Sequence, residues 1–214
     1  MKVLITGFDP FGGETVNPAY EAVKLLPDAI AGANVIKVEV PTVFGKAAEM
    51  LEEKINEHRP DIVLCIGQAG GRPDITIEKV AINYADARIC DNEGSQPLDA
   101  TLREDGDTAY FATVPVKAMV AHIREAGIPA SVSYTAGTFV CNELFYSLMY
   151  LIHQKYPHIK GGFIHVPYST EQTAGKPQGT PSMSIQTITA ALTAAVESTI
   201  LDKDVSSEPM GTLH

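Results

Sequence analysis

The chain has 214 residues, of which 45% are hydrophobic and 20% are charged, a composition typical of one soluble globular domain whose core needs no disulfides or structural metal. Sixteen Lys and Arg against 26 Asp and Glu give a formal net charge of -10, which repels phosphate backbones and anionic lipid headgroups and argues against a nucleic-acid or membrane partner. No apolar run approaches the length of a membrane-spanning helix.

Short β-branched runs bounded by Gly, Pro or Asp alternate along the chain with helical patterns. The runs are typical of buried strands, and we expect strands at 2–6, 34–40, 61–66 and 161–166. A cap formed by Asn17 and Pro18 predicts a helix that ends at Leu26. Further helices are expected at 43–58, 115–126, 141–155 and 181–201. This alternation predicts an α/β fold with a mostly parallel twisted sheet covered on both faces, in which ligands bind at the carboxyl ends of strands.

The ends and the long loop of the chain give further expectations. The N-terminal MKVLITGF is short and has no small-residue cleavage site, so we interpret it as the first strand and expect a cytoplasmic protein. Residues 1–214 are expected to form a single domain with a loose tail from about residue 203. Residues 84–110 are rich in Asp, Gly and Pro, and we expect an irregular hairpin excursion there.

Two glycine-rich loops follow expected strands, GFDPFGG at 7–13 and GQAGG at 67–71. Neither matches a phosphate-binding loop, because Gly13 stands where a Walker loop needs its lysine and GQAGG does not fit GxGxxG. The first loop instead holds Phe8 and Phe11, in a turn where polar residues are usual. These rings either wall an apolar ligand pocket or fill the end of the sheet.

Cysteine and histidine supply the candidate nucleophile and base. Cys141 begins the apolar helix at 141–155, where free amides and the helix dipole favour a thiolate and can hold an oxyanion. The alternative for such a cysteine is a small buried hydrophobe, which is what we expect of Cys65 within DIVLCI. His165 ends the strand GGFIHV at the edge where Cys141 is also expected. A lone histidine at a strand end is also common as a structural residue.

A carboxylate and metal ligands are the remaining groups that such a site can contain. A carboxylate that orients the imidazole would complete a cysteine–histidine pair, and Glu78 lies in the alternating stretch ITIEKVAIN. The residues alone do not favour Glu78 over its neighbours, and such a side chain would ordinarily face solvent. The three cysteines form no CxxC pair, and no HExxH spacing occurs, so we expect no disulfide framework, metal or cofactor. The remaining helical histidines are expected to be solvated, namely His58, His122, His153 and His158.

Four motifs in order, GFDPFGG, GQAGGRPDITIEKVAIN, AGTFVCN and FIHVP, closely resemble the pyroglutamyl peptidase I (pyrrolidone carboxyl peptidase) family of cysteine peptidases. The resemblance extends from residue 3 to about residue 201. It implies a catalytic triad of Glu78, Cys141 and His165, an open α/β/α sandwich, a homotetramer and no cofactor. It also implies a pocket for the pyroglutamyl ring, with Arg88 beside the oxyanion; the residues that match this region are Phe8, Phe11, Gln68, Phe139 and Arg88.

The function implied by the resemblance is that of an exopeptidase that removes an N-terminal pyroglutamyl residue from peptides through a thioester. The lactam of that residue is flat and neutral, so a pocket of phenylalanines with a few polar partners can bury it at little cost. Two alternatives stay open. A nucleoside phosphorylase-like enzyme would not be inhibited by iodoacetamide, and a non-catalytic module would bind a pyroglutamyl peptide without turnover.

Overall fold

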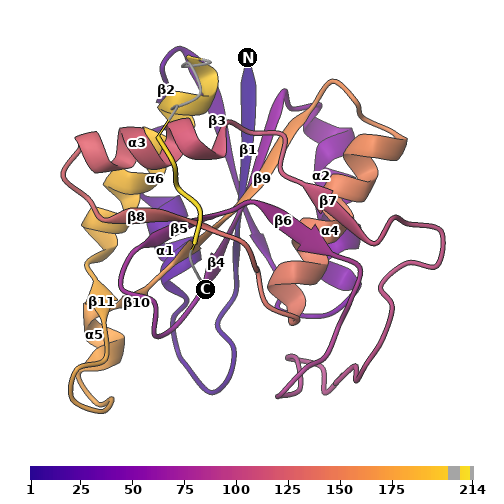
Figure 1. The fold of residues 1–214 in the computed structure, drawn as a ribbon, viewed down its shortest axis with the longest axis horizontal. Coiled ribbons are helices and arrows are strands. Elements are labelled where there is room, and N and C mark those ends of the chain that lie inside the picture. The colour runs from indigo at the N-terminus through magenta and orange to yellow at the C-terminus, as the bar shows by residue number, and fades with distance from the viewer. Residues whose placement is uncertain (202–207, 213–214) are drawn as a thin grey trace.

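A computed structural model of the chain describes residues 1–201 and 208–212 (Figure 1). Within these residues, seven strands form a central sheet. Their spatial order is β2 (Ala29–Ile30), β3 (Ala33–Val40), β1 (Lys2–Phe8), β4 (Ile62–Gln68), β9 (Lys160–Val166), β5 (Ile75–Glu78) and β8 (Ala130–Ser133).

Most neighbouring strands of this sheet run parallel, which confirms the predicted fold class. The pairs β1–β3, β1–β4, β4–β9 and β5–β8 are parallel, whereas β5 runs antiparallel to β9 and β2 antiparallel to β3. The middle strands are buried along nearly their whole length, as parallel strands covered on both faces are. The carboxyl ends of β1, β4 and β9 therefore meet at one edge.

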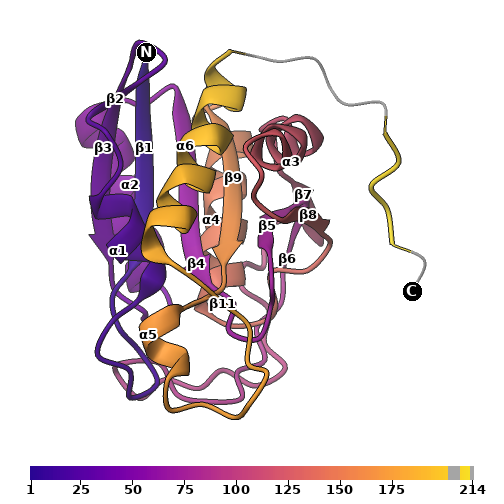
Figure 2. The same cartoon turned by 90° about the vertical axis from the view of Figure 1, so that its left-hand side faces the viewer.

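Helices cover both faces of the sheet (Figures 1 and 2). One face carries α2 (Lys46–His58) and α4 (Val140–Gln154), and the other carries α1 (Pro18–Lys24), α3 (Val116–Glu125) and α6 (Ile185–Ile200). The short α5 (Thr170–Thr173) follows β10 (Tyr168–Ser169), which pairs with β11 (Ser182–Met183).

The predicted helices exist, but two of them begin later than expected. The helix predicted from residue 43 begins at Lys46, because Gly45 before it has a left-handed φ of 76° that no helix can include. The helix predicted from residue 181 begins at Ile185, since Ser184 caps it by accepting the amide of Thr187 at 3.1 Å. The predicted Asn17 cap is confirmed: its Oδ1 accepts the Ala19 amide at 3.1 Å.

The long polar segment is a hairpin excursion, as predicted. Strands β6 (Val80–Ile82) and β7 (Ala109–Phe111) pair antiparallel, and residues 83–108 form the loop between them. One isolated bridge between Ala85 and Ala100 holds the two sides of this loop together.

The hydrophobic core is one contiguous cluster built from both faces of the sheet and the helices that cover them. In the described residues, no helix has the length and apolar character needed to cross a membrane. The tail that was expected to be loose falls mainly on 202–207 and 213–214, outside the described residues.

Candidate active site

The structure places Cys141 at the second residue of α4 and directly over the end of β4. Its Sγ occupies space that a side chain at residue 67 would need, since a Cβ added to Gly67 would lie 2.9 Å from that sulfur and 2.8 Å from Cζ of Phe163. Gly67 pairs in register with His165 of the neighbouring strand β9. Paired residues of adjacent strands point to the same face, so the structure brings Cys141 and His165 together there.

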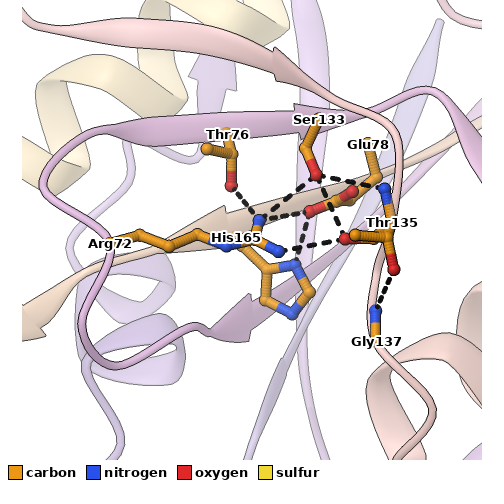
Figure 3. A network of polar contacts seen from close by, with 7 residues as sticks. All are labelled: Arg72, Thr76, Glu78, Ser133, Thr135, Gly137 and His165. Carbon is orange, nitrogen blue, oxygen red and sulfur yellow. Dashed lines mark hydrogen bonds and ion pairs between the residues drawn. The ribbon is translucent and has the colours of Figure 1, made fainter. Parts of the chain in front are cut away.

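His165 is held by the carboxylate of Glu78. Its Nδ1 donates to Oε1 of Glu78 at 2.7 Å, and both side chains are buried (Figure 3). The ring of Phe163 packs against the imidazole with its centroid 4.8 Å away. Because Nδ1 is bound to the carboxylate, Nε2 is the ring nitrogen left for proton exchange.

Glu78 reaches the site from β5, the strand that runs antiparallel to β9. This strand lies between β9 and β8, so all four of its residues are buried, and the alternative of a solvent-facing side chain at Glu78 does not hold. Burial alone would raise the pKa of Glu78, but the hydrogen bond from His165 and the positive charge of Arg72 bring it below its ordinary value. The carboxylate is therefore ionised at neutral pH.

The thiol of Cys141 does not have the lowered pKa that its position at a helix start suggested. Burial raises the pKa of Cys141 to about 12, and the negative charge of Glu78 adds to the increase. Desolvation of the thiolate thus outweighs the helix amides and dipole at this position. In the free chain Cys141 is therefore protonated at neutral pH.

The other two cysteines have different surroundings. Cys65 is completely buried in β4, as expected, and burial raises its pKa to about 12. Cys90 is exposed in the long loop, where its Sγ donates to Oε1 of Gln96 at 3.6 Å. All three cysteines are free.

The predicted phenylalanines divide into two groups. Phe11 and Phe139 lie together, with ring centroids 6.2 Å apart, and Phe44 meets Phe139 edge-on at 5.4 Å. Phe8 is instead a core residue, 1% exposed, with its ring 6.5 Å from that of Phe163. Of the two interpretations of the first glycine loop, filling the end of the sheet thus describes Phe8, and the ligand wall suits Phe11.

A cavity of about 280 Å³ opens beside the start of α4. Its lining residues are Asp86, Arg88, Ile89, Thr138 and Phe139. Arg88 and Phe139 were both expected at the binding site, and the cavity brings them together. Gln68 is not among the lining residues: its amide oxygen accepts from Nε2 of Gln172 at 3.0 Å, on the segment that follows β10.

Comparison with known proteins places this arrangement in a family. A family model described as pyroglutamyl peptidase matches residues 1–202. The chain belongs to the pyroglutamyl peptidase family. It is 56% identical to a pyrrolidone-carboxylate peptidase of Enterococcus faecalis, with all of both chains covered, and 58% identical to one of Clostridium perfringens, with 97% of each covered.

Solved structures of the family have the same fold. Pyroglutamyl peptidase I from Bacillus amyloliquefaciens superposes with a TM-score of 0.92 at 54% identity, covering 97% of this chain and 99% of that one. Pyrrolidone carboxyl peptidase from Thermococcus litoralis also gives a TM-score of 0.92, at 38% identity and the same coverage. The α/β/α architecture is therefore that of the pyroglutamyl peptidases.

Two residues of this pyroglutamyl peptidase site were missed from the sequence. Arg72, which follows the second glycine loop, donates to Oε1 of Glu78 at 2.7 Å. Phe44 falls within the helix predicted at 43–58, but it lies before α2, against Phe139. Phe44 meets a residue distant in the chain. Arg72 precedes Glu78 by only six residues, but no local pattern shows that the two side chains meet. In the described part of the chain, no group of three His, Cys, Asp or Glu side chains is arranged to hold a metal ion.

Proposed function

We propose that this chain is a cysteine exopeptidase that removes N-terminal pyroglutamate from peptides, with Cys141, His165 and Glu78 as its catalytic triad. The observation that carries the proposal is the buried 2.7 Å contact between Glu78 and His165 at the strand end over which Sγ of Cys141 lies. A nucleophile, a base and a group that orients the base are the parts that acyl transfer requires. The family membership supports the same assignment.

The reaction begins with a protonated thiol. As Sγ of Cys141 forms a bond to the scissile carbonyl carbon, Nε2 of His165 takes the thiol proton, and the ionised Glu78 stabilises the resulting imidazolium. His165 then gives this proton to the leaving amine as the carbon–nitrogen bond breaks, which leaves a pyroglutamyl thioester on Cys141. Water, deprotonated by His165, attacks the thioester carbonyl and releases 5-oxoproline and the free thiol.

The start of α4 supplies the oxyanion site in this proposal. The helix has no side-chain cap at Phe139, so its first amides are not engaged by a capping side chain. Such amides, together with the positive end of the helix dipole, stabilise the negative oxygen of the tetrahedral intermediate. Arg88 lines the adjoining cavity and adds positive charge on the same side.

Binding of the pyroglutamyl ring is assigned to the phenylalanines near Cys141. Phe11 and Phe139 offer ring faces to the flat lactam, whereas Phe8 lies in the core against Phe163. The lactam carries one N–H and one carbonyl, and burying it costs little only when both are paired. Gln68, at the end of β4, is proposed as one of the polar residues of this pocket.

The assembly and compartment follow the same proposal. We place the protein in the cytoplasm as a homotetramer, with small pyroglutamyl peptides as substrates. Three free cysteines suit a reducing compartment. Exposed apolar side chains such as Phe111, Leu98 and Tyr134 suit subunit contacts. Light scattering on the purified protein distinguishes a tetramer from a monomer.

Turnover of a pyroglutamyl amide of a fluorogenic amine tests the function. The wild-type chain should release the amine, iodoacetamide should abolish the release, and Cys141→Ser should reduce kcat by several orders of magnitude without unfolding the protein. Cys65→Ser is the matched control, because it also removes a buried thiol but should mainly lower stability. Binding without turnover in the wild type would favour the non-catalytic module, and equal loss of activity in both folded variants would refute the choice of nucleophile.

A further inference from the structure

Arg72 links the carboxylate of Glu78 to another residue of β5, to the end of β8 and to the loop that follows β8. Its Nη1 donates to Oε1 of Glu78 and to Oγ1 of Thr76, both at 2.7 Å, and its Nη2 donates to the carbonyl oxygen of Thr135 at 3.0 Å (Figure 3). Oγ of Ser133 lies at 3.4 Å from the same Nη1. The guanidinium is planar and its donors have fixed directions, so these contacts define one orientation of the group.

The carboxylate of Glu78 is held through a single oxygen. Oε1 accepts from both Arg72 and His165 at 2.7 Å, whereas Oε2 is buried and has no hydrogen-bond partner among the described residues. Charge-assisted bonds of this length are among the strong ones in proteins. Without Arg72, the bond from His165 would be the one strong contact left on the carboxylate, which could then rotate about its side-chain bonds.

We propose that Arg72 is a positioning residue of the triad: it fixes the Glu78 carboxylate so that Oε1 receives Nδ1–H of His165 and Nε2 stays directed at the nucleophile. This inference rests on the proposed function and deepens it. Arg72 touches no reacting atom and acts through Glu78. A displacement of about 1 Å in a catalytic group is enough to cost on the order of 100-fold in rate.

The positive charge of Arg72 has a second effect. The charged or titratable groups that face Glu78 are His165 of β9, Arg72 and Cys141 of α4. Those that act on Cys141 are Glu78, Arg72 and Cys65. Against the burial that raises both pKa values, Arg72 lowers the pKa of Glu78 and of the Cys141 thiol. Removal of this charge should raise both. Because Glu78 must be ionised to stabilise the imidazolium, the acidic limb of the rate profile should move to higher pH.

The test compares Arg72→Met and Arg72→Lys with the wild type on the fluorogenic pyroglutamyl amide. Arg72→Met should lower kcat roughly 10- to 100-fold with KM changed by about twofold or less, and should move the acidic limb of kcat/KM to higher pH. Arg72→Lys keeps the charge but loses the fork of donors. Arg72→Lys should therefore keep the acidic limb of the kcat/KM profile at its wild-type pH while kcat stays reduced. Because a lysine is less disruptive, it also serves if the methionine variant does not fold.

A matched control and a double variant exclude a merely structural role. Arg124 also binds a backbone carbonyl of β8, that of Ala130 at 2.7 Å, but neither oxygen of Glu78 accepts a hydrogen bond from it. Arg124→Met should therefore leave kcat and its pH profile unchanged. Arg72→Met combined with Glu78→Gln should be no slower than Glu78→Gln alone, because both changes disable the same group.

Three results would overturn the inference while the wild type stays active. They are a wild-type kcat in folded Arg72→Met, a fall in kcat with no shift of the acidic limb, and additive losses in the double variant. Absence of turnover in the wild type would instead defeat the proposed function itself, so the two failures are distinguishable.

Discussion

Gly67 is the residue at which a single added methyl group should disturb Cys141, the proposed nucleophile, most directly. The added Cβ of Gly67→Ala would lie 2.9 Å from Sγ of Cys141 and 2.8 Å from Cζ of Phe163. Carbon atoms pack best at about 3.5–4.0 Å, so these neighbours must move apart by roughly 0.5–1 Å. Gly67 does not have a positive φ, and alanine is therefore compatible with its backbone.

A shift of that size acts on the reaction more than on the fold. Overpacking of this kind costs about 1–3 kcal/mol of stability, whereas a 1 Å misplacement of a reacting atom costs on the order of 100-fold in rate. We expect Gly67→Ala to fold, to lose roughly 100-fold in kcat, and to react more slowly with iodoacetamide at Cys141.

The assay measures kcat and KM on the pyroglutamyl amide, the rate of thiol alkylation and the midpoint of thermal unfolding. Gly162→Ala is the control, since its Cβ would lie 2.5 Å from Cγ2 of Val114, away from Cys141. It should lose similar stability and keep nearly all its kcat. A folded Gly67→Ala with wild-type kcat would refute the placement of the nucleophile over this glycine.

Three further predictions concern the triad, the substrate and a buried acid. Glu78→Gln should lower kcat less than His165→Ala, because orienting a base matters less than supplying it; full activity in Glu78→Gln would move the orienting role elsewhere. The prolyl amide, which lacks the lactam carbonyl and carries a charge, should be cleaved far more slowly than the pyroglutamyl amide; comparable kcat/KM values would contradict a pocket that recognises the lactam. Burial raises the pKa of Glu143 from 4.5 to about 7. The stability that the protonated carboxyl contributes is therefore fully present below pH 4.5 and is lost as the pH rises through 7. Glu143→Gln should therefore raise the free energy of unfolding by up to about 3 kcal/mol at pH 9 and change it little at pH 4; chemical denaturation at both values measures this, and equal effects would disprove it.

Much of the fold follows from local patterns in the sequence. The β-branched run of β4 and the cap formed by Asn17 and Pro18 act between residues close in the chain, so they predict a strand and a helix start directly. The predicted start of a helix was less accurate where a single backbone angle sets the boundary, as the left-handed φ of Gly45 does before α2. The antiparallel direction of β5 was not visible locally, because strand direction depends on which neighbours pair across the sheet.

Local sequence patterns identified the chemical groups of the site: a cysteine at a helix start, a histidine at a strand end, and phenylalanines in a loop. The electrostatics of these groups depend on how distant segments pack around them. Glu78 is buried because its strand lies inside the sheet, and Arg72 reaches it from a neighbouring loop. Burial also reversed the expected shift in the pKa of Cys141. Desolvation depends on everything that packs around a charge, and those atoms come from segments far apart in the chain.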